Sequence, residues 1–234
     1  MNSRKIRLLL WSGCLAHVIL FAGDMLYYGE WGSGHYSNKE TMAHVALWRL
    51  HLGSLTAPVG MGFALLAVLG LWYCCRRAAP RLAAVMLASL YAFCFLGVLE
   101  HGVFGPLGFA LRYCGQTSDA VTQIIKLFSI TEHAMDLLFV GFLVWIFLTL
   151  RKKCGVPRWT VFLCPLVTIW LQGVMVYVPG PLCHPLMGGW NNIAFTVWYA
   201  VLALTYKDQD IGSQVAEMAE SELTGSPKSS EKGA

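Results

Sequence analysis

Charged residues are scarce in this chain. Asp, Glu, Lys and Arg together make up 13% of its 234 residues, whereas hydrophobic residues make up 56%. Soluble domains carry about 25% charged residues, so the sequence lacks about half of the charged surface that a water-soluble fold carries. Long basic runs are also missing, which argues against a nucleic-acid partner. The composition indicates a protein whose surroundings are a lipid bilayer.

The alternation of apolar and polar residues that marks transmembrane strands is missing as well. The apolar residues instead fall in blocks of about twenty, the length of helix that crosses about 30 Å of hydrocarbon. The sequence therefore predicts an all-α fold, a polytopic transmembrane helix bundle over residues 1–207. Six spans are expected: 8–28, 50–73, 82–104, 129–150, 159–178 and 191–206.

Lysine and arginine are unevenly distributed between the two ends of these spans. With the N-terminus inside, eleven of them fall on the inner side, and only Lys39, Arg49, Arg112 and Lys126 fall on the outer side. Such an excess is typical of the cytoplasmic side of multi-pass proteins. Both termini are therefore expected in the cytoplasm, and the membrane is a plasma membrane or a bacterial inner membrane. Residues 208–234 are rich in Ser, Glu, Lys and Gly, which predicts a disordered cytoplasmic tail.

Two helix starts can be read from the residues between spans. Ser37 and Glu40 form a capping box, which predicts a helix from near Asn38 into the second span. Ser118 and Asp119 predict another start, before a long fourth helix.

The few ionisable residues inside the predicted spans gather in their outer half. At about 1.5 Å rise per residue, His17 lies near mid-depth and the others lie closer to the outside. These others are Asp24, His51, Glu100, His101, Glu132, His133 and Asp136, together with the amides of Gln172, Asn191 and Asn192. Because an intramembrane charge is costly, each needs a partner or a role. The coincidence in depth predicts a polar pocket that opens toward the outside.

A structural interpretation competes with this functional one. Intramembrane polar side chains often only bond to a neighbouring helix and hold the bundle together. In that case Glu100 and Glu132 would pair with Arg49 or Arg112 near the interface. Two Glu-His dipeptides on two different spans exceed what helix association requires, so the sequence favours a site.

One functional interpretation is a metal site. Histidine and carboxylate residues three and four positions apart are ordinary ligand spacings for a divalent transition metal such as zinc. The expected ligands are His101, Glu132, His133 and Asp136, although the HExxH motif is missing. A metal-bound water there would attack a lipid-like ester or amide.

A second interpretation is acid–base catalysis without a metal, with Asp24, Glu100, Glu132, His133 and Asp136 as the catalytic residues. Burial favours the neutral forms of carboxyl and imidazole groups, so both can exchange protons with a substrate. A membrane enzyme or binding protein for a lipophilic molecule is therefore the leading expectation.

Two further alternatives remain open from the sequence. The first is a small transporter or a proton or cation pathway, because a chain of carboxylates and histidines can relay ions. Against it, the inner half has few polar residues, and the chain shows no inverted repeat. The second is a structural subunit without a small ligand. The sequence leaves the oligomeric state open.

Among the eight cysteines, two fall outside the membrane in the predicted topology. Cys114 lies in the connection between the third and fourth spans, and Cys183 lies between the fifth and sixth. An even pair on the oxidising side is what a disulfide needs, so we expect a Cys114–Cys183 bond over the pocket.

The segment Ala22-Gly23-Asp24-Met25-Leu26-Tyr27-Tyr28 resembles one found in small, uncharacterised polytopic membrane proteins. Trp48-Arg49-Leu50-His51 and Glu132-His133 fit the same resemblance, which covers most of residues 5–206. It implies a bundle of six or seven helices and no established activity.

Overall fold

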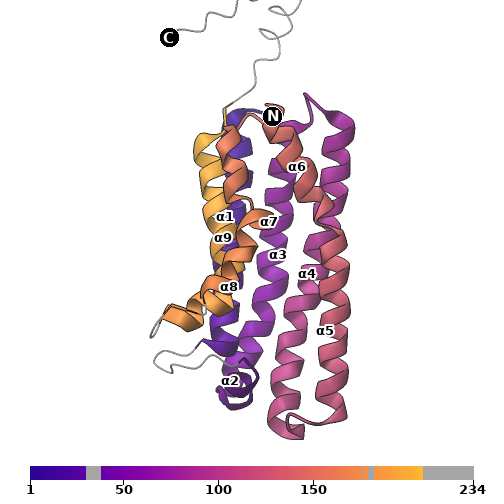
Figure 1. The fold of residues 1–234 in the computed structure, drawn as a ribbon, viewed down its shortest axis with the longest axis vertical. Coiled ribbons are helices and arrows are strands. Elements are labelled where there is room, and N and C mark those ends of the chain that lie inside the picture. Colours follow the sequence, from indigo (N-terminus) through magenta and orange to yellow (C-terminus); the bar gives the residue numbers. More distant parts are fainter. Residues whose placement is uncertain (30–37, 176, 179–181, 208–234) are drawn as a thin grey trace, which may run out of the picture.

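The computed structural model describes residues 1–29, 38–175, 177–178 and 182–207, and within them every regular element is a helix. The longest helices lie side by side along the long axis of the bundle, and α1 begins at the same end at which α9 finishes (Figure 1). We call this the inner end and the opposite one the outer end. The main helices are α1 (Ser3–Tyr28), α2 (Asn38–His44), α3 (Leu47–Cys75), α4 (Pro80–Cys114), α5 (Asp119–Leu137), α6 (Val140–Leu150) and α9 (Cys183–Thr205).

Four helical stretches are long and apolar enough to cross a membrane. They are Ser3–Tyr28, Leu47–Cys75, Pro80–Cys114 and Asp119–Leu150, and they contain the first four predicted spans. Their outward surfaces carry exposed large apolar side chains such as Leu55 and Phe95, as lipid contact requires. The prediction of a polytopic helical membrane bundle is confirmed. The sixth predicted span lies within α9, whose 23 residues include Asn191 and Asn192.

The fifth predicted span, 159–178, is not one helix. The chain there forms η1 (Arg158–Leu163), α7 (Pro165–Thr168), η2 (Ile169–Leu171) and α8 (Gln172–Met175). Pro165 disfavours the helical conformation for the residue before it, and Cys164 accordingly has φ −56° and ψ 132°. This broken segment, 158–175, lies beside α9 (Figure 1).

The two predicted helix starts have different outcomes. Ser118 is the N-cap of α5 and accepts a hydrogen bond from the backbone N–H of Val121, as expected. The helix starting at Asn38 does not run into the second span, because α2 ends at His44 and α3 begins anew at Leu47. Ser37 of the expected capping box, like the predicted tail at 208–234, lies outside the described residues.

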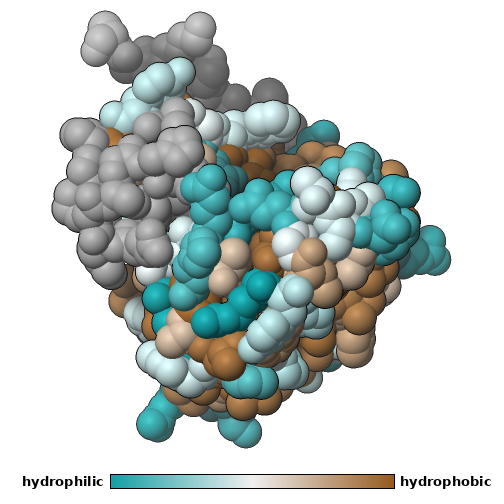
Figure 2. All heavy atoms as spheres, turned by 90° about the horizontal axis from the view of Figure 1, so that it is seen from below, coloured by the Kyte–Doolittle hydropathy of each residue, from teal (hydrophilic) through white to brown (hydrophobic). Residues whose placement is uncertain are grey.

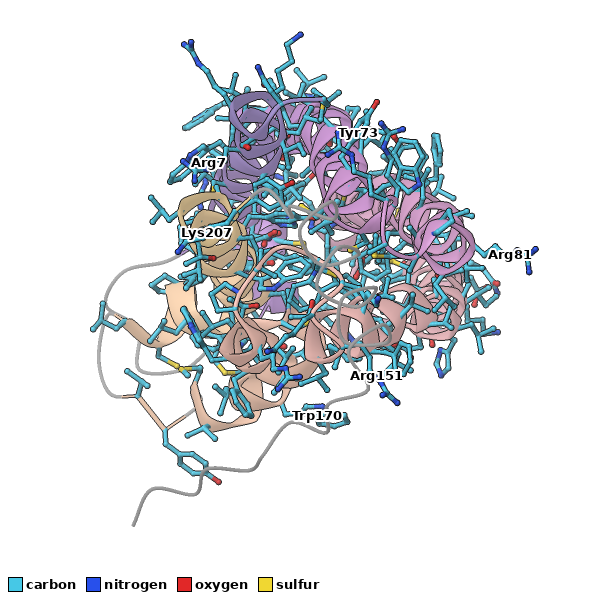
Figure 3. The ribbon with its side chains drawn as sticks, turned by 90° about the horizontal axis from the view of Figure 1, so that it is seen from above. Arg7, Tyr73, Arg81, Arg151, Trp170 and Lys207 are labelled. Carbon is cyan, nitrogen blue, oxygen red and sulfur yellow. The ribbon has the colours of Figure 1, made fainter. Side chains whose placement is uncertain are left out.

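The helices enclose a common interior. α1 packs between α9 and α3, α3 packs on α4, and α4 packs on α5 and α6. The broken segment contacts α6 on one side and α9 on the other, so the order of neighbours closes into a ring (Figure 3). In the inner half the ring is filled by apolar side chains, including the fully buried Trp145 and Trp198.

The inner end is fastened by contacts between distant parts of the chain. The guanidinium of Arg7 donates to the carbonyl oxygen of Tyr206 at 2.8 Å, which ties the start of α1 to the end of α9. The basic side chains of Arg7, Arg81, Arg151 and Lys207 lie around the periphery of this end (Figure 3). That placement agrees with the cytoplasmic orientation predicted from the sequence.

Two arginines of the outer half close helix ends. Arg49 donates to the carbonyl oxygens of Met25, Leu26 and Gly29 at 2.6 to 2.9 Å, and so satisfies the last turn of α1. Arg112 donates to the carbonyl oxygen of Val45 at 2.7 Å, just after α2. Hydrophilic residues gather over the middle of the outer end, and hydrophobic residues lie below and to the right of them, with further hydrophilic residues at the edges (Figure 2).

Candidate functional site

A cavity of about 380 Å³ occupies the outer half of the ring. Its lining comes from α1, α3, α4, α5, α6, the broken segment and α9. Ten of the described lining residues carry polar side chains: His17, Asp24, Tyr28, Glu100, His101, Glu132, Asp136, Gln172, Asn191 and Asn192. Six carry phenyl rings: Phe93, Phe104, Phe128, Phe139, Phe142 and Phe195. This volume lies within the range of small-molecule sites, about 300 to 1,000 Å³.

The innermost polar groups of the cavity form a buried network between α1 and α9. His17 Nδ1 donates to Asn192 Oδ1 at 2.9 Å, and Asn192 Nδ2 donates to Asp24 Oδ2 at 2.7 Å. All three side chains are buried, and the imidazole of His17 also stacks on Phe195 with 4.2 Å between ring centroids. His17 and Asp24 are seven positions apart, two helical turns, which is why they share one face of α1.

The network continues toward α4 through His101. Its Nδ1 lies 3.1 Å from the carbonyl oxygen of Gly97, which can only accept, so this nitrogen carries a proton. Its Nε2 lies 3.9 Å from Asp24 Oδ1, and its Nδ1 lies 3.9 Å from Glu100 Oε2. These distances allow electrostatic attraction and are too long for direct hydrogen bonds. The imidazole therefore lies between two carboxyl groups, close to both without a direct hydrogen bond to either.

The third part of the site is a group of carboxylates on α4 and α5. Glu132 and Asp136 are one turn apart on α5, line the cavity and are exposed. Glu100 lines the same cavity from α4. The pairing of Glu100 or Glu132 with Arg49 or Arg112 is not found among the described residues, since both arginines bond to backbone carbonyls.

Two histidines that the sequence analysis placed in the polar pocket do not line the cavity. His133 is exposed on α5, and its Nδ1 lies 2.6 Å from the carbonyl oxygen of Ser129. Adjacent helical residues point about 100° apart, so His133 turns away when Glu132 faces inward. His51 is exposed on α3 and lies against Phe109, with 5.0 Å between ring centroids.

The expected metal site is not formed. In the part of the chain that the structure describes, no three His, Cys, Asp or Glu side chains come together in a way that could hold a metal ion. His101 faces Asp24, whereas His133 lies outside the cavity, so the proposed set of His101, Glu132, His133 and Asp136 does not converge. Sequence spacing correctly predicted that Glu132 and Asp136 share one face of their helix. It could not predict how neighbouring helices are oriented, which decides whether side chains from different helices converge.

The expected disulfide is not formed either. Cys114, at the end of α4, is an exposed free thiol, and Cys183, at the start of α9, is a buried free thiol. The predicted topology placed both cysteines on the outer side, but this alone does not bring their sulfur atoms within bonding distance.

The sequence interpretation missed the aromatic lining. Phe93, Glu100 and Phe104 lie at positions i, i+7 and i+11 on α4, and Phe128, Glu132 and Met135 form a similar stripe along α5, with Phe139 just before α6. Helical spacing from the two glutamates would have identified these residues.

One side of the cavity opens at the surface. α5 packs against α4, and the broken segment packs against α9, so these elements form separate walls (Figure 1). Lining residues occur on both walls, with Glu132 and Asp136 on α5 and Leu166, Ile169 and Gln172 on the broken segment. Glu132 and Asp136 line the cavity and are also exposed, so the cavity reaches the surface at α5.

Comparisons with known proteins give one match. No curated protein and no solved structure matches the chain. A family model matches residues 1–209, which covers all described elements from α1 to α9. The chain therefore belongs to the family of unknown function DUF6796, in agreement with the resemblance to small polytopic membrane proteins without an established activity.

Proposed function

We propose that this protein binds a lipophilic molecule in the outer-half cavity. The observation that carries the proposal is the composition of one continuous lining. Six phenyl rings provide an apolar surface, and ten polar side chains from several helices converge on the same space. Ligand sites combine apolar walls with a few polar groups that fix orientation in this way.

The lining separates into regions that suit the two parts of an amphiphilic molecule. The side chains of Asp24, Glu100 and His101 lie close to one another, within 3.9 Å from nitrogen to carboxylate oxygen. Phe93, Phe139 and Phe142 form a cluster of rings with centroids 5.5 to 6.2 Å apart. A polar head group would lie at the first region and a hydrocarbon or aromatic body against the second.

The opening between α5 and the broken segment provides a route from the membrane. Exposed apolar side chains occur on both walls, Leu137 at 81% exposed and Trp170 at 80%. A molecule dissolved in the bilayer would enter between these walls without crossing the aqueous phase. Its polar group would then meet Glu132 and Asp136 first, and Glu100 and Asp24 deeper in the cavity.

The interior beyond His17 favours binding over transport. Tyr199, Trp198 and Trp145 are buried there, in an apolar cluster that also includes Leu10 and Leu71. Within the described residues, no polar chain leads from His17 through this cluster to the inner end. A transporter would need a second conformation in which the cluster opens.

Photolabelling of protein in lipid nanodiscs tests the proposal. A phenyl diazirine should label peptides that contain Phe93, Met135 or Phe139, and excess unlabelled diphenylpropanol should suppress this labelling. The variant Ile169→Trp, which fills part of the cavity, should remove the suppressible labelling. Val167→Trp is the matched control, because Val167 is 43% exposed and does not line the cavity. Labelling that excess competitor does not reduce, or that Ile169→Trp leaves unchanged, would overturn the proposal.

A further inference from the structure

The charged side chains that line the cavity have one sign. Asp24, Glu100, Glu132 and Asp136 contribute four carboxyl groups, and no Lys or Arg is among the described lining residues. The two histidines do not balance them. His17 is enclosed between Asn192 and Phe195, and a single imidazole, His101, lies near Asp24 and Glu100.

These carboxyl groups have few partners within the protein. Asp24 accepts hydrogen bonds from Asn192 and Tyr28, and among the described residues Glu100 has the 3.9 Å approach of His101. The side chains of Glu132 and Asp136 form no hydrogen bond or ion pair with any described residue, and both line the same cavity as Glu100. Carboxyl groups that line a cavity with apolar walls are costly to keep charged, so they either take up a proton or are stabilised by a positive charge that joins them.

The aromatic residues next to the carboxylates also suit a positive charge. Phe104 lies edge-on to His101, with 6.1 Å between ring centroids, and 5.4 Å from the ring of Phe128 on α5. All three line the cavity. The face of a phenyl ring attracts a cation within about 6 Å, and this attraction strengthens when water is excluded.

Resting on the proposed function, we propose that the ligand is a lipophilic organic cation, namely an amine with a hydrocarbon or aromatic body. Its ammonium group binds between Glu100 and Asp24 on one side and Glu132 and Asp136 on the other. Its apolar body lies on the phenylalanine rings. A bare metal ion is a poorer fit, because no three His, Cys, Asp or Glu of the described residues converge as ligands.

Three probes with one carbon skeleton separate charge from shape. Diphenylpropylamine, diphenylpropanol and diphenylpropanoate differ only in carrying a positive, a neutral or a negative end group. Their affinities are measured at neutral pH by equilibrium dialysis against the full chain in nanodiscs, with empty nanodiscs as the blank. We expect the amine to bind at least about tenfold more tightly than the alcohol, a difference in binding free energy of about 1.4 kcal/mol. The carboxylate should bind more weakly than the alcohol.

Variants then place the amine at the carboxylates. Glu100→Gln and Asp136→Asn should each weaken amine binding about tenfold and leave alcohol binding within about twofold. Asp136 is exposed, so its variant is not expected to disturb packing. Asp119→Asn is the matched control, since Asp119 is exposed on the same helix, α5, and lies outside the cavity.

Each outcome supports or overturns one of the two proposals. Saturable binding of the alcohol or the carboxylate as tight as that of the amine would overturn the cation inference and leave the lipophile-binding function standing. Binding of none of the three probes above the empty nanodisc would overturn both. If Glu100→Gln and Asp136→Asn both leave the preference for the amine unchanged, the carboxylates do not cause it. That result would overturn the cation site.

Discussion

Asn192 of α9 donates a 2.7 Å hydrogen bond to Asp24 of α1, across 168 positions of sequence. Its side-chain oxygen accepts from His17 Nδ1 on the same helix as Asp24, so one amide satisfies two buried groups. The geometry fixes how α1 and α9 face each other along the cavity. Asn192 is therefore both a part of the lining and a connection between two helices of the bundle.

Replacing Asn192 with Ala should lower the thermal stability of the protein in nanodiscs. The change removes one hydrogen bond from a buried carboxyl and one from a buried imidazole, and each such loss costs about 1 to 3 kcal/mol. Asn191→Ala is the matched control, because Asn191 is exposed and has no hydrogen bond to a described residue. Equal melting temperatures for the two variants would show that the network contributes no stability.

Close packing of α1 on α3 supports the same wall of the cavity. A Cβ atom at Gly60 would lie 2.7 Å from Leu20 Cγ and 3.1 Å from the carbonyl oxygen of Ala16, whereas one at Gly62 would meet nothing within 4 Å. Gly60→Ala should therefore destabilise the protein by about 1 to 3 kcal/mol, through displacement of α1. Gly62→Ala should be neutral or slightly stabilising, because Ala favours helix over Gly. Thermal unfolding of the two variants measures the difference, and a stable Gly60→Ala would contradict the contact.

The sequence predicted the faces of single helices better than the relations between helices. The pairs His17 with Asp24 and Glu132 with Asp136 follow from helical periodicity alone, and the structure places all four on the cavity lining. The start of α5 at Ser118 was also readable, because capping depends on a few adjacent residues.

Features that depend on packing were not predictable in this way. The dipeptides Glu132-His133 and Asn191-Asn192 each offer two polar side chains, and only the neighbouring helices decide which one is buried or faces inward. The break at Cys164 had a local signal in Pro165, but the hydropathy of 159–178 concealed it. Whether Cys114 meets Cys183 depends on where α4 ends and where α9 begins in space, which topology does not give.

Cys114 provides a test of both orientation and thiol state. It is exposed at the outer end, whereas the other seven cysteines are buried. A membrane-impermeant maleimide added to intact cells should label the protein once, and Cys114→Ser should abolish the label. Prior reduction should not increase labelling, because the thiol is free. Labelling only after permeabilisation would show that the orientation is the opposite of the predicted one. Labelling only after reduction would show that Cys114 is in a disulfide.

The broken segment is held in place by side chains of α9 and by one of its own. Trp190 Nε1 donates to the carbonyl oxygen of Thr168 at 2.8 Å, and Gln172 Nε2 donates to the carbonyl oxygen of Met187 at 2.8 Å. α7 and α8 have only four residues each, too few to satisfy their own carbonyl groups within the helix. In a bilayer these carbonyls have no water to bond, so donors from elsewhere in the chain must serve them.

Trp190→Phe should therefore loosen the wall formed by residues 165–175. The substitution keeps an aromatic ring, removes the N–H donor and leaves the Thr168 oxygen unpaired, at a cost of about 1 to 3 kcal/mol. Hydrogen–deuterium exchange in nanodiscs should become faster in 165–175 and stay unchanged in α3. Trp170→Phe is the matched control, since Trp170 is 80% exposed and makes no hydrogen bond to a described residue. This wall carries Leu166 and Ile169 of the cavity lining, so Trp190→Phe should also weaken the photolabelling that the competitor suppresses. If both the exchange rate and the labelling stay unchanged, the Trp190–Thr168 hydrogen bond does not hold the wall in place.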